Sequence, residues 1–256
     1  MRTLAHVDEG GGPLSDGQRI TGLAAVLSGA EDEAALRSGI RSLLLPGQEY
    51  LHHYNEGAKR RIEIAYALAE FDFHGAVLVT RVTGNNHQEP ARARLLGWLL
   101  PRLQHTERVD HVLIESRHGG DKHDRRTVRL LQRSHQITSQ LTIHHLRKRA
   151  DERLWVADFV MGAYVSAHLH GEGEPWEVLT NAHVIDVVRE GAQKTRNPGS
   201  HCPAGGPGLT RAPAEPGPLP AASADRLACR GQDATQNSAW HVTRSEDLGP
   251  PAPGSG

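Results

Sequence analysis

Three acidic residues interrupt apolar stretches of the chain, and acids in such positions can carry chemistry. Asp8 follows an apolar run near the N-terminus, Glu115 ends the stretch His111-Val-Leu-Ile-Glu, and Asp158 lies inside a long apolar segment. Carboxylate oxygens are the ligands that Mg²⁺ and Mn²⁺ prefer. Such ions can activate water and stabilise the leaving oxygen of a phosphodiester. If the three acids converge in the fold, they predict a metal-dependent hydrolytic site.

Asp158 is the most informative of the three acids. Its neighbours one helical turn away are apolar or small: Leu154, Trp155, Met161 and Gly162. This spacing places Asp158 on the core-facing stripe of a helix. Because burying a lone carboxylate is costly, Asp158 should be paired or bound to a metal. The structural alternative is a buried ion pair with an arginine.

Asp8 and Glu115 have structural alternatives of their own. Strand alternation places Asp8 on the face opposite Glu9, and a solvated strand end would account for both acids. Acidic residues are uncommon in strands, so Glu115 at the end of an apolar strand segment is unusual. A purely structural pairing with Arg117 or Arg81 would explain it.

Two further acids lie in the glycine-containing segment that follows Glu115. Asp124 is a natural N-cap for the next helix, and capping is its structural alternative. Asp121 is more typical of a loop residue. Either could instead act as a fourth metal ligand.

The densest basic region of the chain follows the same strand. Arg125, Arg129 and Arg133 recur at helical spacing and would form one positive stripe beside Glu115. With Arg117, we hypothesise that this stripe contacts a phosphate backbone. An ordinary solvated helix face is the alternative. The net charge of -1 lacks the basic balance of many nucleic-acid-binding proteins, so any such site must be a local patch.

Seventeen histidines raise the question of a zinc site. No Cys or Glu completes a tetrahedral spacing around the pairs His52-His53 or His144-His145, and there is no His-Glu-x-x-His motif. We therefore expect most histidines to be structural. His52 is the exception, because it could assist proton transfer.

Strand-like and helix-like segments alternate along the chain, which predicts an α/β fold with a largely parallel or mixed sheet covered by helices. Gly10-Gly-Gly-Pro13 is expected to end the first strand. The expected strands are 4–9, 20–27, 76–82, 109–116, 141–146 and 184–188. The first expected helix begins near Glu31 and ends before Pro46-Gly47. The other expected helices cover 58–70, 89–104, 124–136 and 152–169.

The composition changes near residue 190. Ten of the 15 prolines and ten of the 27 glycines lie from Gly191 onward, a low-complexity pattern typical of disorder. We therefore expect one domain over residues 1–190 and a Pro/Gly-rich disordered tail over 191–256. Both cysteines, Cys202 and Cys229, fall in that tail.

The chain has no apolar run of 18 residues, and its first residues are too polar for a signal-peptide core. We therefore expect a soluble, cytoplasmic protein without a membrane partner.

Several short motifs together resemble one family. They are Val7-Asp-Glu-Gly10, Ile114-Glu-Ser-Arg117, Asp124-Arg-Arg126, the segment from Trp155 to Gly162, and the region around 51–61. Over residues 4–190 they resemble the bacterial domain-of-unknown-function family numbered 3800, most closely its short actinobacterial members. That family is placed in the ribonuclease H-like superfamily, whose members cut or rearrange nucleic acids with acidic residues and divalent metal.

The resemblance implies a ribonuclease H-like mixed sheet flanked by helices. It implies that Asp8, Glu115 and Asp158 bind Mg²⁺ or Mn²⁺, with Asp124 or Asp121 as a fourth ligand. One position departs from the family, because Gly10 stands where the family usually has serine. Two functions follow: a metal-dependent nuclease, or a non-catalytic interaction protein that keeps only the fold.

Overall fold

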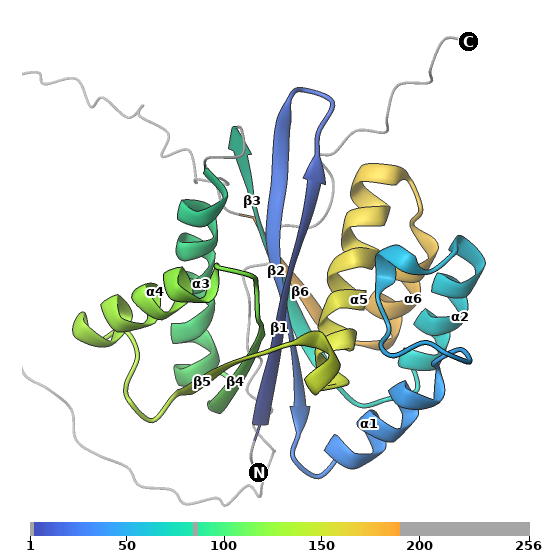
Figure 1. Ribbon diagram of the computed structural model, residues 1–256, viewed down its shortest axis with the longest axis horizontal. Coiled ribbons are helices and arrows are strands. Elements are labelled where there is room, and N and C mark those ends of the chain that lie inside the picture. The colour runs from blue at the N-terminus through green and yellow to red at the C-terminus, as the bar shows by residue number, and fades with distance from the viewer. Residues whose placement is uncertain (1–2, 84–86, 190–256) are drawn as a thin grey trace, which may run out of the picture. The chain divides into compact units, whose positions relative to one another are not determined.

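The computed structural model describes residues 3–83 and 87–189, and within them a six-stranded sheet lies between two layers of helices (Figure 1). The predicted tail, with its two cysteines, lies outside the described residues. The strands are β1 (Thr3–Pro13), β2 (Gln18–Gly29), β3 (His74–Thr83), β4 (Val109–Glu115), β5 (Thr142–Leu146) and β6 (Ile185–Arg189).

The strand order across the sheet is β5-β4-β1-β2-β3-β6. Strands β1, β2 and β3 form an antiparallel meander. Strands β4 and β5 extend it in parallel on the β1 side, and β6 pairs in parallel with β3. The predicted α/β fold, with a mixed sheet flanked by helices, is confirmed.

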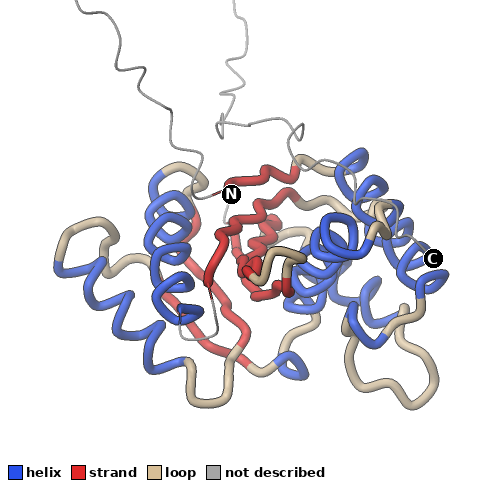
Figure 2. The backbone as a smooth tube through the Cα atoms, turned by 90° about the horizontal axis from the view of Figure 1, so that it is seen from above, coloured by secondary structure: helices blue, strands red, loops and turns tan. Residues whose placement is uncertain are grey.

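Helices cover both faces of the sheet. Helices α1 (Glu33–Ser42), α2 (Ala58–Leu68), α5 (Arg153–Val165) and α6 (Glu174–Ala182) lie on one face, and α3 (Gln88–His105) and α4 (Asp121–Arg133) on the other. Viewed from above, the strands lie between these two groups (Figure 2). Short helical turns occupy His53–Asn55, Lys148–Ala150 and Ser166–His170, the last a π-helix that prolongs α5. Within the described residues, no helix has the length and apolar character needed to cross a membrane.

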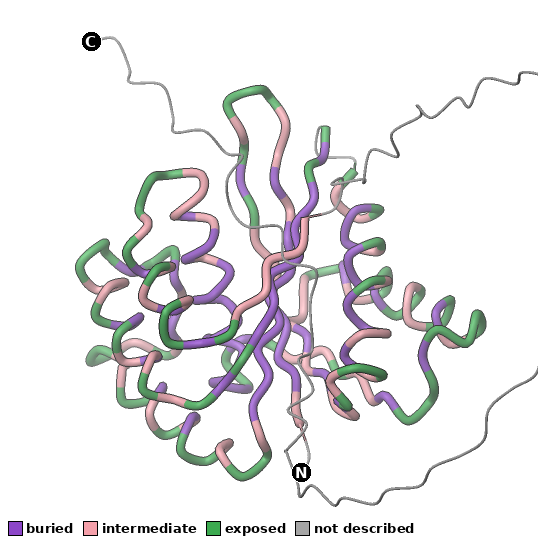
Figure 3. The backbone as a smooth tube through the Cα atoms, turned by 180° about the vertical axis from the view of Figure 1, so that it is seen from behind, coloured by how far each residue is buried: buried purple, intermediate pink, exposed green. Residues whose placement is uncertain are grey.

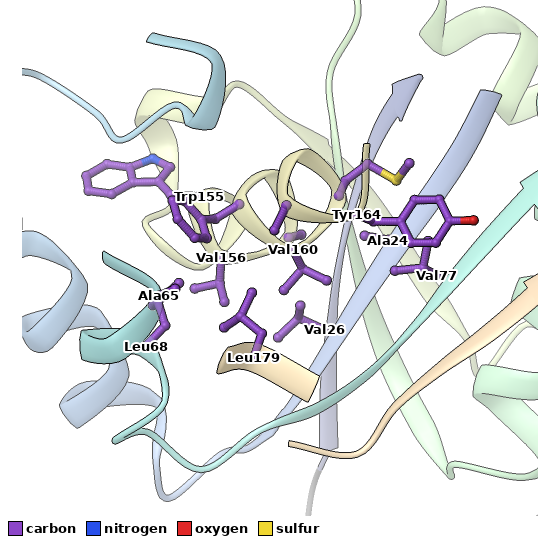
Figure 4. Packing of buried hydrophobic residues seen from close by; sticks show 14 of the residues in the cluster. Ala24, Val26, Ala65, Leu68, Val77, Trp155, Val156, Val160, Tyr164 and Leu179 are labelled. Atoms are coloured by element: carbon purple, nitrogen blue, oxygen red, sulfur yellow. The ribbon is translucent and has the colours of Figure 1, made fainter. Parts of the chain in front are cut away.

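Side-chain alternation along the strands divides the apolar residues into two cores. Ala5 and Val7 point toward α3, whereas Ala24 and Val26 point toward α5. The central strands are buried on both faces (Figure 3). Helix α5 is buried around nearly its whole circumference. Its residue Val156 belongs to the core between this helix and the sheet (Figure 4). A polar side chain on such a helix must therefore find a partner inside the protein.

The expected break at Gly10-Gly-Gly-Pro13 is wrong, because β1 continues through this segment. Gly10 pairs with Gly22 on β2, and the ladder extends to Pro13. A Cβ atom on Gly10 would lie 2.6 Å from Cγ of Met161 on α5. The glycine here thus permits close packing of a helix on a strand, and it does not mark a turn.

Two helices also differ from expectation. Helix α4 begins at Asp121, so Asp124 lies inside its first turn and is not the N-cap. Helix α6 has no counterpart among the expected helices. Its nine residues are few for a periodic signal, and Pro175 at its start is favourable there.

Candidate active site

Strand register brings Asp8 and Glu115 together. Val7 on β1 pairs with Ile114 on β4 in a parallel ladder, and both side chains lie in the core on the α3 side. The next residue of each strand, Asp8 and Glu115, therefore points to the opposite face, toward α5. Strand β4 ends at Glu115, whereas β1 continues, so Asp8 is not a strand end. Only 4% of Asp8 is exposed, which excludes the solvated alternative.

Asp158 on α5 and Lys148 complete the cluster. The Lys148 Nζ lies 2.7 Å from Asp158 Oδ1, 3.1 Å from Glu115 Oε2 and 3.5 Å from Asp8 Oδ2. The three predicted acids thus meet around one ammonium group, and we call these four residues the acidic cluster. Asp158 is paired as expected for a buried acid, but its partner is a lysine and not an arginine.

Neighbouring groups hold Asp158 and Lys148 in place. The backbone N–H of His53 donates to Asp158 Oδ2 at 2.7 Å, and Trp155 Nε1 donates to the Lys148 carbonyl at 2.7 Å. Gly162 makes room for the His53 ring, since a Cβ there would lie 2.3 Å from the ring Cγ. Burial and the nearby charge of Arg61 lower the pKa of His53 to about 4.

The acidic cluster contains three carboxyl groups but only one ammonium group. Burial, a side-chain hydrogen bond with Glu115 and the charge of Asp158 raise the pKa of Asp8 well above its usual value. Burial alone would lower the pKa of Lys148, but the charges of Asp8 and Asp158 raise it. Three acids facing one lysine leave the cluster short of positive charge.

The raised pKa of Asp8 predicts that Asp8→Asn stabilises the fold near pH 8. A carboxyl whose pKa is higher in the folded state lowers stability once the pH exceeds its unfolded pKa, because ionisation then favours unfolding. The variant's gain should therefore be present at pH 8 and disappear near pH 3. Thermal melts at both values measure it, with about 2–4 °C expected per kcal/mol in a domain of this size. A lower melting temperature at pH 8 would contradict the expectation.

Asp124 belongs to a different group of contacts. Arg92, 3% exposed, binds Asp124 through two nitrogens at 2.9 and 3.0 Å and reaches Glu9 at 2.8 Å. His145 lies 3.1 Å from Asp124, and Arg117 lies 3.3 Å away. Although burial opposes ionisation, His145 and Arg92 hold the pKa of Asp124 well below its usual range. These contacts do not support Asp124 as a fourth metal ligand.

The Asp121 side chain stabilises the turn that precedes α4. Its carboxylate accepts hydrogen bonds from Ser116 Oγ at 2.7 Å and from the Arg117 backbone at 2.9 Å. It thereby fixes the chain just after Glu115. These contacts give it a local structural role.

Two hollows meet at the acidic cluster. One, of about 730 Å³, is lined by Asp8, Glu115 and Asp158 and by the apolar side chains of Met161 and Val165. The other, of about 720 Å³, is lined largely by polar and basic residues: Tyr50, Ser116, His118, Asp121, Arg147 and Arg149. Four residues line both hollows: His52, Glu115, Arg117 and Lys148.

The remaining predicted site residues occupy different places. His52 is 34% exposed in its side chain, and its Nε2 lies 3.9 Å from Asp158 Oδ1. Arg117 reaches the hollows while also binding Glu89 at 2.8 Å. Arg125 and Arg129 are exposed on α4 and line neither hollow, so their contact with phosphate stays a prediction.

Sequence reasoning missed Lys148 and Arg92. Lys148 belongs to the triplet Arg147-Lys-Arg149, which suggests only a basic surface. The available signal is its position two residues after β5, since ligand sites in α/β sheets lie beyond the carboxyl ends of strands. Arg92 has no comparable signal, because its partners come from β1 and α4.

The donor chemistry of the acidic cluster, three carboxylates around one ammonium group, is of the kind that divalent cations bind. Glu115 Oε2 is buried without a hydrogen bond, although the ammonium lies 3.1 Å away. Mg²⁺ binds oxygen at about 2.0–2.1 Å, closer than any of the three ammonium contacts. Among residues 3–83 and 87–189, no group of three or more Asp, Glu, His or Cys side chains is arranged so that it could hold a metal ion.

No protein-family model matches the chain, and no curated protein matches it. Among solved structures, it is similar to RNase HII of Archaeoglobus fulgidus, determined in complex with PCNA, at 15% identity and a TM-score of 0.39, covering 64% of this chain and 73% of that one. It is also similar to a mutant of Bst-RNase HIII, at 14% identity and a TM-score of 0.40, covering 66% of this chain and 54% of that one. Bst-RNase HIII in complex with Mn²⁺ matches at 16% identity and a TM-score of 0.36, covering 63% and 51%. The chain spans about half the length of the two RNase HIII structures, and similarities this distant carry no information on its activity.

Proposed function

We propose that this protein is a divalent-metal-dependent nuclease that hydrolyses phosphodiester bonds, and that it belongs to the family its motifs resemble. One observation carries the proposal. Asp8, Glu115 and Asp158, which are far apart in the chain, meet within 3.5 Å of a single ammonium nitrogen. A structural ion pair needs only one acid, whereas clustered carboxylates supply the oxygen ligands that Mg²⁺ and Mn²⁺ prefer.

The three carboxylates would hold the ion, which supplies Lewis-acid activation of water and neutralises phosphate charge when bound. His52 lines both hollows and lies near Asp158, so it can accept or deliver a proton at the open side of the cluster. Met161 and Val165 give the hollow of about 730 Å³ an apolar wall beside the acidic cluster.

The hollow of about 720 Å³, which Arg147 and Arg149 line, suits the phosphates of a nucleic acid. The Arg147 side chain is exposed and makes no ion pair or hydrogen bond within the described residues, so it is free to bind a phosphate oxygen. Arg149, whose guanidinium lies 5.5 Å over the Tyr50 ring, adds a second positive charge to this hollow. A strand lying in this hollow would place a phosphodiester at the acidic cluster.

The test is a cleavage assay with the full chain and labelled single- and double-stranded DNA, RNA and hybrid substrates. Mg²⁺, Mn²⁺ and EDTA are compared, and the Asp8→Asn/Asp158→Asn double variant, purified identically, controls for contaminating nucleases. We expect cleavage with Mn²⁺ or Mg²⁺ that is absent with EDTA and in the double variant. Equal cleavage by the double variant, or none with any substrate and metal, would refute the proposal.

A second candidate function, a non-catalytic interaction protein, is favoured by two observations. Lys148 already neutralises part of the cluster. A serine at position 10, where the family usually has one, would place its Cβ 2.6 Å from Met161 Cγ, so the packing here leaves no room for that side chain. This candidate predicts no Mn²⁺ binding and no effect of Asp158→Asn on partner binding. Titration of the protein with Mn²⁺ separates the two functions.

A further inference from the structure

We infer that the Lys148 ammonium occupies the position of the catalytic cation and must leave the acidic cluster before a divalent ion can bind. Lys148 would then act as a built-in competitor of the metal. This inference rests on the proposed function, and it concerns how the site is loaded.

The contacts of Lys148 are uneven, as expected for one ammonium shared by too many acids. Only Asp158 makes a short hydrogen bond to it, at 2.7 Å. Glu115 Oε2 faces the ammonium without a hydrogen bond, and Asp8 Oδ2 lies at the limit of one, at 3.5 Å. A lysine satisfies this cluster incompletely, whereas a divalent ion brings twice the charge and binds several oxygens at once.

The lysine can leave without disturbing the fold. The Trp155 indole holds the Lys148 carbonyl, so the backbone is anchored independently of the ammonium. The side chain is a flexible four-carbon stem. It also lines the hollow of about 720 Å³ on the Arg147 side, which has room to receive it. In that hollow, the displaced ammonium would lie where we propose that the phosphates of the nucleic acid bind.

The inference makes a direct prediction about metal affinity. Lys148→Met keeps the apolar stem and removes the competing charge, so it should bind Mn²⁺ at least tenfold more tightly than the wild type. Lys59→Met, at an exposed position on α2, is the matched control and should leave the affinity unchanged. Adding Asp158→Asn to Lys148→Met should abolish the gain. Affinities are measured by Mn²⁺ electron paramagnetic resonance and by calorimetry, with no substrate present.

A second measurement uses the wild-type protein and does not depend on the variant folding. Amine acetylation, followed by mass spectrometry, reports how accessible each lysine is. We expect Mn²⁺ to increase the labelling of Lys148 severalfold and leave that of Lys59 unchanged. If the wild type binds Mn²⁺ but Lys148 labelling stays constant and Lys148→Met gains no affinity, the inference fails and the proposed function stands. If neither protein binds Mn²⁺, both fail.

Discussion

Asp158→Asn is expected to reduce metal-dependent cleavage by roughly 100-fold or more while leaving the fold intact. Loss of outer-shell partners of a metal site alone costs about 10–100-fold, and Asp158 would be a direct ligand. The substitution removes the charge that both Lys148 and a divalent ion would bind. The Asn carbonyl oxygen can still accept the hydrogen bond from the His53 backbone, so the contact that orients the side chain is retained.

Single-turnover cleavage rates at saturating Mn²⁺ measure this effect, and circular dichroism melts confirm folding. Asp16→Asn is the matched control, because Asp16 lies in the exposed turn between β1 and β2 and takes no part in the cluster. A folded Asp158→Asn protein that cleaves at the wild-type rate would contradict the role of Asp158.

Arg92→Met is expected to lower the free energy of unfolding by about 3–5 kcal/mol, the usual cost of breaking a buried ion pair by removing one partner. Arg92 and Asp124 are 3% and 2% exposed in their side chains, and Arg92 also binds Glu9. Methionine fills a similar volume but leaves the Asp124 carboxylate without its bidentate partner. His145 and Arg117 remain near Asp124 and compensate only in part.

Urea denaturation of four proteins tests this expectation: wild type, Arg92→Met, Arg92→Met/Asp124→Leu, and Arg129→Met. The double variant removes both buried charges and should recover much of the loss, since apolar replacements of a buried pair are often neutral. Arg129 is exposed on α4, so its replacement should change stability by less than about 0.5 kcal/mol. A loss below about 1 kcal/mol for Arg92→Met would show that the pair is not a structural anchor.

The periodicity of the sequence was sufficient to assign faces to the candidate acids. Alternation in the first strand separates Asp8 from Glu9, and in the structure Asp8 faces Lys148 while Glu9 faces Arg92. Helical spacing places Asp158 on a buried stripe, and it is 8% exposed. Both patterns are local, because they depend only on which neighbours of a residue are apolar.

Local rules failed where distant segments meet. The glycines after Glu9 indicate a strand end, yet Gly10 is needed because Met161 packs against that strand. Asp124 has the residue type of an N-cap, but Arg92 from another helix holds it inside the first turn. In both places a tertiary contact outweighs the local preference.

The sequence by itself determined the α/β class, most strands and helices, and the faces on which Asp8 and Asp158 lie. Only the tertiary structure decided that Asp8, Glu115 and Asp158 share one lysine and that Asp124 belongs elsewhere. The physical reason is strand register. A slip of one residue between β1 and β4 would turn Glu115 to the opposite face, and that register depends on the packing of both cores at once.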